Sequence, residues 1–133
     1  ADFMATNKDI KVELVSADHQ NKPDVGSSIA AKWFDVDKVD MILVMSVNPG
    51  FGGQHFLPSA TRKIAELREL RSRYTFNFVI EVDGGIAPET VPQVVRAGAE
   101  FLVAGTSVFH QQDPGKALQE LQRLASEAFL QRA

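Results

Sequence analysis

The sequence contains no cysteine among its 133 residues. The chain can therefore form no disulfide, supply no thiolate nucleophile and offer no cysteine ligand to a metal. Its longest apolar stretch, residues 41–47, is far too short to cross a bilayer, and the N-terminus lacks a basic segment followed by an apolar core. These absences predict a soluble, cytoplasmic protein.

The chain also lacks a strong excess of either charge. Fourteen Lys and Arg residues oppose seventeen Asp and Glu residues, which gives a formal net charge of −3, and neither sign forms a long run. This balance favours neither nucleic acid nor an anionic membrane as a partner. Apolar residues make up 44% of the sequence, so we expect one ordered domain with a real core.

Short apolar runs alternate with helical patterns four times along the chain. The predicted strands are 10–16, 39–47, 76–82 and 101–104, and the predicted helices are 23–34, 59–73, 88–97 and 114–130. The nearly unbroken hydrophobicity of 39–47 predicts burial on both faces of a parallel sheet. We expect Gly98 to end the third helix. The inward face of the last helix should carry Leu118, Leu121, Leu124 and Ala128.

Repeated strand-helix units with right-handed crossovers place all strands parallel. The predicted fold class is therefore α/β, with four strand-helix units in a single domain spanning residues 1–133. Two architectures satisfy this pattern: half of a TIM barrel, or an open flavodoxin-like or Rossmann-like sheet with helices on both sides. A half barrel leaves two bare strand edges, so in that case we expect a homodimer.

Glycine-rich loops follow three successive predicted strands, and Asp83 ends one of these strands. A bound phosphate needs backbone N–H groups that converge without a Cβ in the way. A single Gly-Gly pair would more often only turn the chain, but three such motifs at successive strand ends favour one phosphate site. Asp83 is the strongest candidate for acid-base chemistry. The candidate phosphate-binding residues are Gly50, Gly52, Gly53, Gly84, Gly85, Gly105, Thr106 and Ser107.

Residues 39–125 resemble the C-terminal half of the ribulose-phosphate 3-epimerases, which are TIM-barrel enzymes. The resemblance rests on VMSVNPGFGGQHF at 44–56, IEVDGGI at 80–86, AGAEFLVAGTSVF at 97–109 and the Asp113-Pro114 pair. It implies that the glycine loops hold the phosphate of a pentose 5-phosphate. It also implies that Asp83 binds a divalent metal (zinc, iron or manganese) and moves a proton at C3, and that Met45 packs over the reacting enediolate. Without the resemblance, Met45 would be interpreted as core.

Epimerisation needs two proton-transfer groups, one on each face of a planar enediolate, and this chain offers one. In the family, the second aspartate and the metal-binding histidines come from the N-terminal half of the barrel, and no motif here matches them. We interpret Asp18 and His19 as loop residues rather than metal ligands. The sequence thus predicts a phosphate-binding domain that does not turn over alone, with an active dimer that contributes Asp83 twice as the alternative.

Residues 10–39, IKVELVSADHQNKPDVGSSIAAKWFDVDKV, resemble a different family, the branched-chain amino-acid class of periplasmic solute-binding proteins. This second resemblance predicts a chimera, with a solute-binding segment over 10–38 and an epimerase-like half-barrel segment over 39–133. A natural truncation with a divergent front end is the other explanation. An amino-acid binding module is the third functional hypothesis, although that family binds its ligand between two lobes.

Overall fold

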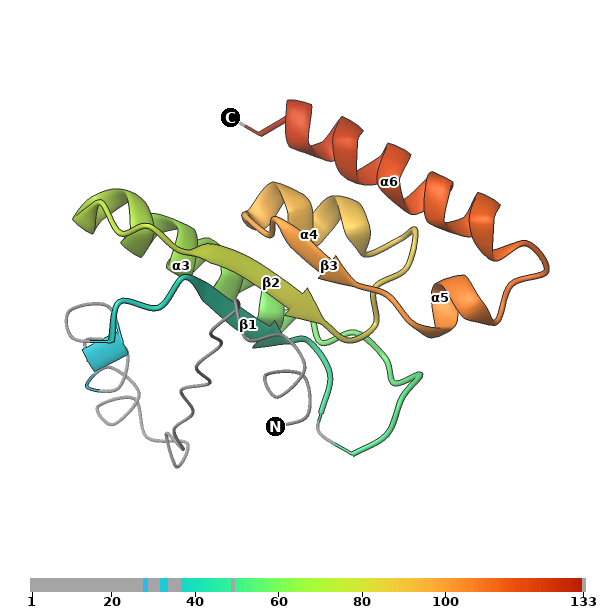
Figure 1. Cartoon of the computed structure of the whole chain (residues 1–133), viewed down its shortest axis with the longest axis horizontal. Coiled ribbons are helices and arrows are strands. Elements are labelled where there is room, and N and C mark those ends of the chain that lie inside the picture. The colour runs from blue at the N-terminus through green and yellow to red at the C-terminus, as the bar shows by residue number, and fades with distance from the viewer. Residues whose placement is uncertain (1–27, 29–31, 34–36, 49, 133) are drawn as a thin grey trace, which may run out of the picture. The chain divides into compact units, whose positions relative to one another are not determined.

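The computed structural model describes residues 28, 32–33, 37–48 and 50–132 (Figure 1). The chain divides into two compact units, residues 1–38 and 39–133, and each is described by itself. The first predicted strand, Asp18, His19 and most of the first predicted helix lie outside the described residues. The single-domain prediction stays a prediction. None of the described helices is long and apolar enough to cross a membrane.

The unit 39–133 is built from three parallel strands and the helices that follow them. Strands β1 (Met41–Met45), β2 (Val79–Asp83) and β3 (Phe101–Val103) form one sheet in the order β1-β2-β3. The helices are α3 (Ser59–Tyr74), α4 (Val91–Ala97), α5 (Thr106–Phe109) and α6 (Pro114–Leu130). The parallel α/β class predicted from the sequence is confirmed. Helix α5 was not predicted, because a single turn gives no periodic signal.

Local chemistry explains where the helices begin and end. The side chain of Asp113 accepts a hydrogen bond from the amide of Lys116, and Pro114 occupies the first turn, so α6 begins where the sequence predicts. Gly98 ends α4 at a φ of 141°, and its amide donates to the carbonyls of Val94 and Val95. Helix α4 starts three residues later than predicted, because residues 88–90 form a turn.

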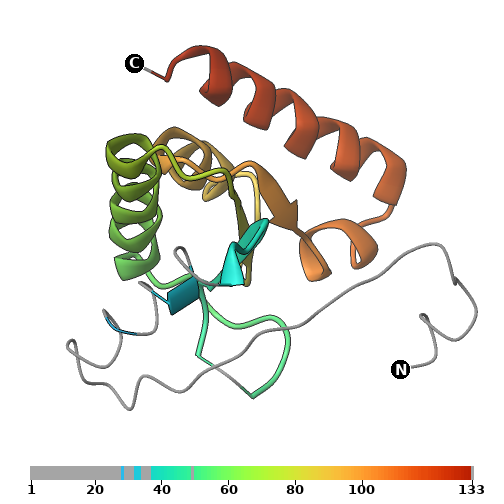
Figure 2. The ribbon, with the colours of Figure 1, turned by 60° about the vertical axis from the view of Figure 1, so that its left-hand side comes forward.

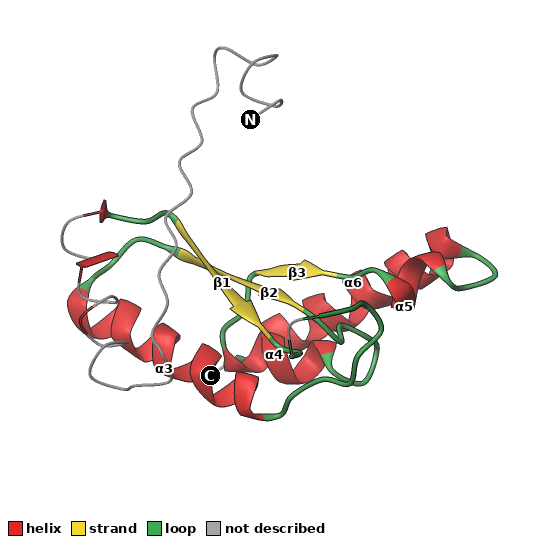
Figure 3. Ribbon diagram, turned by 90° about the horizontal axis from the view of Figure 1, so that it is seen from below, coloured by secondary structure: helices red, strands yellow, loops and turns green. Residues whose placement is uncertain are grey.

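The helices α3, α4 and α6 lie on one side of the sheet (Figure 3). Helix α4 lies between α3 and α6 and packs against both (Figure 2). The core between the layers contains Val44, Ile80 and Val82 from the strands and Ile64, Val91 and Val94 from the helices. A one-sided helical layer is typical of a barrel segment, whereas an open doubly wound sheet has helices on both faces.

No described helix of the unit 39–133 covers the other face of the sheet. Its register places Leu43, Glu81 and Phe101 in one row and Met45, Asp83 and Val103 in the next, nearer the strand ends. Leu43 is 50% exposed and Phe101 is 52% exposed. The prediction that strand 39–47 is buried on both faces is therefore wrong, because no described helix covers this side. We call this face the open face.

The surface of α6 brings a second correction. Leu121 and Ala128 are buried as predicted, but Leu118 is 47% exposed. Leu118 lies in the first half of a long helix whose contacts are chiefly with α4 and the short α5. The prediction that Leu118 faces the core is therefore wrong for the described residues.

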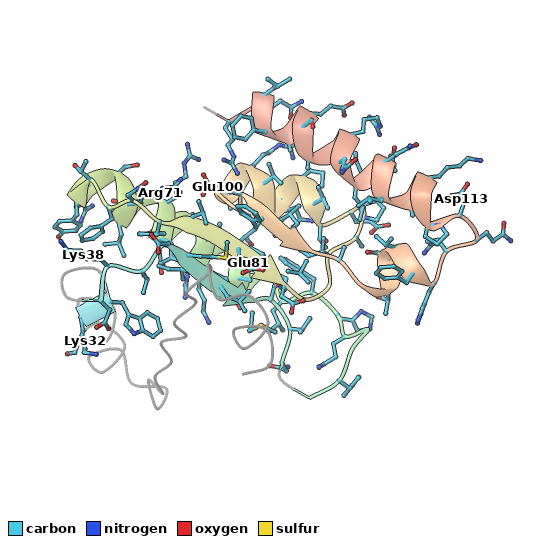
Figure 4. The ribbon with its side chains drawn as sticks, viewed as in Figure 1. Lys32, Lys38, Arg71, Glu81, Glu100 and Asp113 are labelled. Carbon is cyan, nitrogen blue, oxygen red and sulfur yellow. The ribbon has the colours of Figure 1, made fainter. Side chains whose placement is uncertain are left out.

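A network around one ion pair lies at the amino ends of β2 and β3, at the end of the sheet away from the glycine loops. Arg71 of α3 lies 2.6 Å from a carboxylate oxygen of Glu100, the residue before β3 (Figure 4). The same Glu100 oxygen accepts the amide of Ile80 at 3.2 Å, and Arg71 also donates to the carbonyl of Phe78 at 2.8 Å. This network links α3, β2 and β3, so it stabilises the sheet at the end away from the candidate site.

Candidate functional site

A cavity of about 410 Å³ lies at the carboxyl ends of the three strands. The row Met45, Asp83 and Val103 from the open face lines it, together with the loop that follows each strand. Carboxyl ends of parallel strands meet at one edge of a sheet, so residues far apart in the sequence converge here.

The cavity gathers nearly all of the candidate site residues. Ser107 lines an adjoining cavity of about 1180 Å³, and its hydroxyl donates to the carbonyl of Ile86 at 2.5 Å. The candidates that line the smaller cavity are Met45, Gly50, Gly52, Gly53, Asp83, Gly84, Gly85, Gly105 and Thr106. These residues line one cavity, and the role of each in binding or catalysis stays a prediction.

The turn after β2 requires glycine at two positions. Gly84 has a φ of 116°, and a Cβ there would lie 2.6 Å from Cγ2 of Val47. Gly85 has a φ of 62°, and a Cβ there would lie 2.9 Å from the backbone nitrogen and Cα of Phe56. Both φ values disfavour side chains, and the neighbouring loop leaves no room for them. The Gly84-Gly85 pair therefore permits close packing of two loops at the cavity.

The side chain of Gln54 holds the loop after β1 in place. The amide group of Gln54 donates to the carbonyl of Asn48 at 2.5 Å and to the carbonyl of Phe51 at 2.9 Å. Phe51 itself is 75% exposed. The loop thus has a hydrogen-bonded base and presents an exposed aromatic ring.

Ser46 is a residue of this region that sequence reasoning missed. Its side chain is completely buried, and its hydroxyl lies 3.0 Å from the carbonyl of Asp83 and 2.6 Å from that of Gly84. Its amide also donates to the carbonyl of Asp83 at 2.9 Å. A serine between Met45 and Val47 was the available signal, since a polar residue in an apolar run needs a buried partner.

Asp83 is the one ionisable side chain among the described residues that line the smaller cavity. Glu81 lies one row further from the loops on the open face (Figure 4), and His55 lines the larger cavity. An anion in the smaller cavity would meet backbone amides rather than the cations of Lys or Arg. No second proton-transfer group lies beside Asp83 in the described lining.

Metal ligands are equally sparse in the described part of the chain. It contains no group of three or more His, Cys, Asp or Glu side chains arranged to hold a metal ion. A catalytic metal site usually takes three protein ligands, and Asp83 supplies at most one carboxylate. The described residues therefore do not fit the divalent metal that the family resemblance implies.

Comparison with known proteins decides the family. Residues 10–109 match the model of the Ribulose-phosphate 3 epimerase family. The chain belongs to that family. The chloroplastic ribulose-5-phosphate-3-epimerase of Arabidopsis thaliana is 45% identical over 93 residues, which cover 70% of this chain and 33% of the relative.

Two bacterial ribulose-phosphate 3-epimerases match similarly. The protein of Escherichia coli K12 is 43% identical over 86 residues, covering 65% of this chain and 38% of the relative. The protein of Bacillus subtilis is 46% identical over 86 residues, covering 64% and 40%. The chain thus spans between a third and two fifths of the length of these epimerases.

The epimerase match confirms one resemblance and leaves the other without support. It begins at residue 10, so it includes the segment 10–38 for which the sequence predicts a solute-binding parent. Nothing in these matches supports that parent or a chimera. The parallel sheet with a one-sided helical layer is consistent with a partial TIM barrel of the epimerase family.

Proposed function

We propose that the cavity at the carboxyl ends of β1, β2 and β3 binds the phosphate group of a pentose 5-phosphate. The observation that carries this proposal is the convergence of three glycine loops on one cavity whose described lining contains no Lys, Arg or His side chain. Backbone N–H groups without a neighbouring Cβ are suited to a phosphate in such a place. The curated relatives are named for ribulose phosphate, which supports the same ligand class.

The proposed chemistry assigns Asp83 to one proton transfer. Inversion of C3 in ribulose 5-phosphate removes the C3 proton, forms a planar enediolate and returns a proton to the opposite face. Asp83 would exchange the proton on one face, while Met45, its neighbour in the same row, would pack against the planar carbon skeleton. The opposite face has no donor in the described lining, so we propose that this chain alone binds the ligand without turnover.

The test is the thermal stability of the chain with and without D-ribulose 5-phosphate. A ligand that binds only the folded state raises the melting temperature, and the stabilisation grows with the logarithm of the ligand concentration relative to its dissociation constant. The proposal predicts a rise that depends on ligand concentration, together with no xylulose 5-phosphate in a coupled assay with or without added divalent metal. An unchanged melting temperature at saturating ligand would refute the proposed binding.

A charge change at Gly105 gives a sharper version of this test. A Cβ at Gly105 meets no atom within 4 Å, so a small side chain can be added without a clash. A carboxylate about 6 Å from a phosphate dianion costs about 3 kcal/mol at an effective dielectric constant of about 40, which corresponds to a loss of affinity of about a hundredfold. Gly105→Asp should therefore lose the ligand response, while Gly105→Asn, its uncharged match, should keep most of it.

An active dimer is the second proposal, and the open face is the observation that favours it. Met45 is 44% exposed and Val103 is 41% exposed, and both line the cavity beside Asp83. Parallel sheets are normally covered on both faces, so a second copy that covered the open face would bury apolar surface and bring a second Asp83. Light scattering measures the mass of the oligomer, and the coupled assay measures turnover. A dimer with Asp83-dependent turnover supports this proposal, and a monomer contradicts it.

No described feature favours an amino-acid binding module, and a branched-chain amino acid added in the same thermal assay tests it. The origin of residues 10–38 in a solute-binding protein and a cytoplasmic location both stay predictions.

A further inference from the structure

Three consecutive carbonyl groups in the turn after β2 each accept a hydrogen bond from a different side-chain hydroxyl. Ser46 donates to the carbonyl of Gly84 at 2.6 Å, Thr90 to that of Gly85 at 2.8 Å, and Ser107 to that of Ile86 at 2.5 Å. The three hydroxyls come from three separate segments: the residue after β1, the residue before α4, and α5. The turn is therefore fixed from three sides.

This arrangement determines where the amides of the turn point. In a trans peptide the carbonyl of one residue and the N–H of the next lie in one plane and point in opposite directions. When the carbonyls of Gly84 and Gly85 are directed toward hydroxyls of the protein, the N–H groups of Gly85 and Ile86 are directed away from them. The next N–H, that of Ala87, is already taken by the hydroxyl oxygen of Thr90 at 2.9 Å.

The amides of Gly85 and Ile86 are the two that remain. Neither Gly85 nor Ile86 donates its N–H to any residue that the structure describes. Both residues line the smaller cavity, and Ile86 is only 4% exposed. A buried N–H without an acceptor costs free energy, so an acceptor at this position would be favoured. Successive N–H groups in such a turn form a concave site for an anion.

We propose that Ser46 and Thr90 are positioning residues that orient the Gly85 and Ile86 amides toward the phosphate, which they do without touching it. This inference rests on the proposed phosphate-binding function and adds the device on which its affinity depends. It also changes the part expected of Ser107: its hydroxyl orients the peptide between Ile86 and Ala87 rather than contacting the phosphate directly. Donors held in place before the ligand arrives bind it more tightly than donors that must be ordered.

Thr90 offers the cleanest test, because valine has nearly the same shape without the hydroxyl. Thr90→Val removes the donor to Gly85, whereas Thr90→Ser keeps it. We expect Thr90→Val to weaken inorganic phosphate and D-ribulose 5-phosphate about tenfold in titration calorimetry, and Thr90→Ser to stay within about twofold of wild type. In ¹⁵N NMR, the phosphate-induced shifts of the Gly85 and Ile86 amides should shrink in Thr90→Val, while that of Thr106 should persist.

The outcomes separate this inference from the function on which it rests. If wild-type protein does not bind phosphate, the proposed function fails and the inference fails with it. If wild type binds and Thr90→Val binds equally well with unchanged amide shifts, the inference alone is refuted. A purely structural role for Thr90 would lower the melting temperature of the free protein without changing the phosphate affinity of the folded fraction, and this result also refutes it. Should Thr90→Val not fold, Ser46→Ala makes the same comparison for the Gly85 amide. Ser107→Ala is then the control, because the Ser107 hydroxyl bonds the peptide that carries the Ala87 amide.

Discussion

Replacing Gly85 with alanine should destabilise the chain, because two separate features of the turn oppose a side chain there. The φ of 62° lies in the left-handed region. The new Cβ would also lie 2.9 Å from the backbone nitrogen and Cα of Phe56. Rotation of a side chain cannot relieve a contact with backbone atoms, so the loop after β1 would have to move.

The expected magnitude follows from these contributions. An alanine in the left-handed region costs about 1–2 kcal/mol. The reduced freedom of the unfolded chain offsets about 0.4–1 kcal/mol of that cost. Movement of the Phe56 backbone adds to it, so we expect a net loss of about 1–3 kcal/mol. For a domain of this size, that loss corresponds to a fall in melting temperature of about 5–15 °C.

Thermal unfolding followed by circular dichroism measures this effect, and Gly52→Ala is the matched control. Gly52 lines the same cavity, but a Cβ there meets no atom within 4 Å and its φ is not positive. The control should change stability by no more than about 0.5 kcal/mol. Equal melting temperatures for Gly85→Ala and Gly52→Ala would show that the two loops do not pack as described, and the argument for a shaped cavity would fail.

Three further predictions concern the core, the ion-pair network and the surface of α6. Val82→Ala should cost about 2–3 kcal/mol in urea unfolding, because Val82 is completely buried between sheet and helices; a loss below about 1 kcal/mol would contradict that packing. Glu100→Gln should lower the free energy of unfolding by about 1–3 kcal/mol, since it weakens bonds to Arg71 and to the amide of Ile80. The control Glu66→Gln, on the exposed face of α3, should leave the free energy of unfolding nearly unchanged. The pKa of Glu120 should lie below its usual range because Arg123 donates hydrogen bonds to its carboxylate, and Arg123→Ala should return it in an NMR titration. Any stability from that pair is present above the unfolded pKa of Glu120 and disappears as the pH falls through the lower folded pKa.

Local signals explain the parts of the fold that the sequence predicts well. Asp113 and Pro114 define the start of α6, and Gly98 ends α4, because capping depends on neighbouring residues alone. The convergence of the glycine loops on one cavity also follows from the pattern, since parallel strands end at one edge. These predictions need only the order of elements and the chemistry of single residues.

Features that depend on packing between distant segments were beyond the sequence pattern. The exposure of Leu43 and Leu118 depends on which faces find a covering layer, and apolar character alone predicts burial for both. The hydroxyl bonds of Ser46 and Thr90 to the turn after β2 depend on the approach of separate segments. A short helix such as α5 gives no periodic signal at all. Tertiary contacts thus determine which hydroxyl groups bond to the turn after β2. The glycine loops of the cavity, by contrast, can be recognised from the sequence.

An NMR titration of ¹⁵N-labelled protein with D-ribulose 5-phosphate tests most directly whether the three strand ends form one phosphate site. We expect saturable shifts of the amides of Gly53, Gly85 and Gly105 with a single shared dissociation constant, because all three residues line one cavity. Residues of α3 far from the cavity, such as Glu69, should not respond. Shifts that follow different dissociation constants, or that are confined to one loop, would contradict the claim that the three strand ends form one phosphate site.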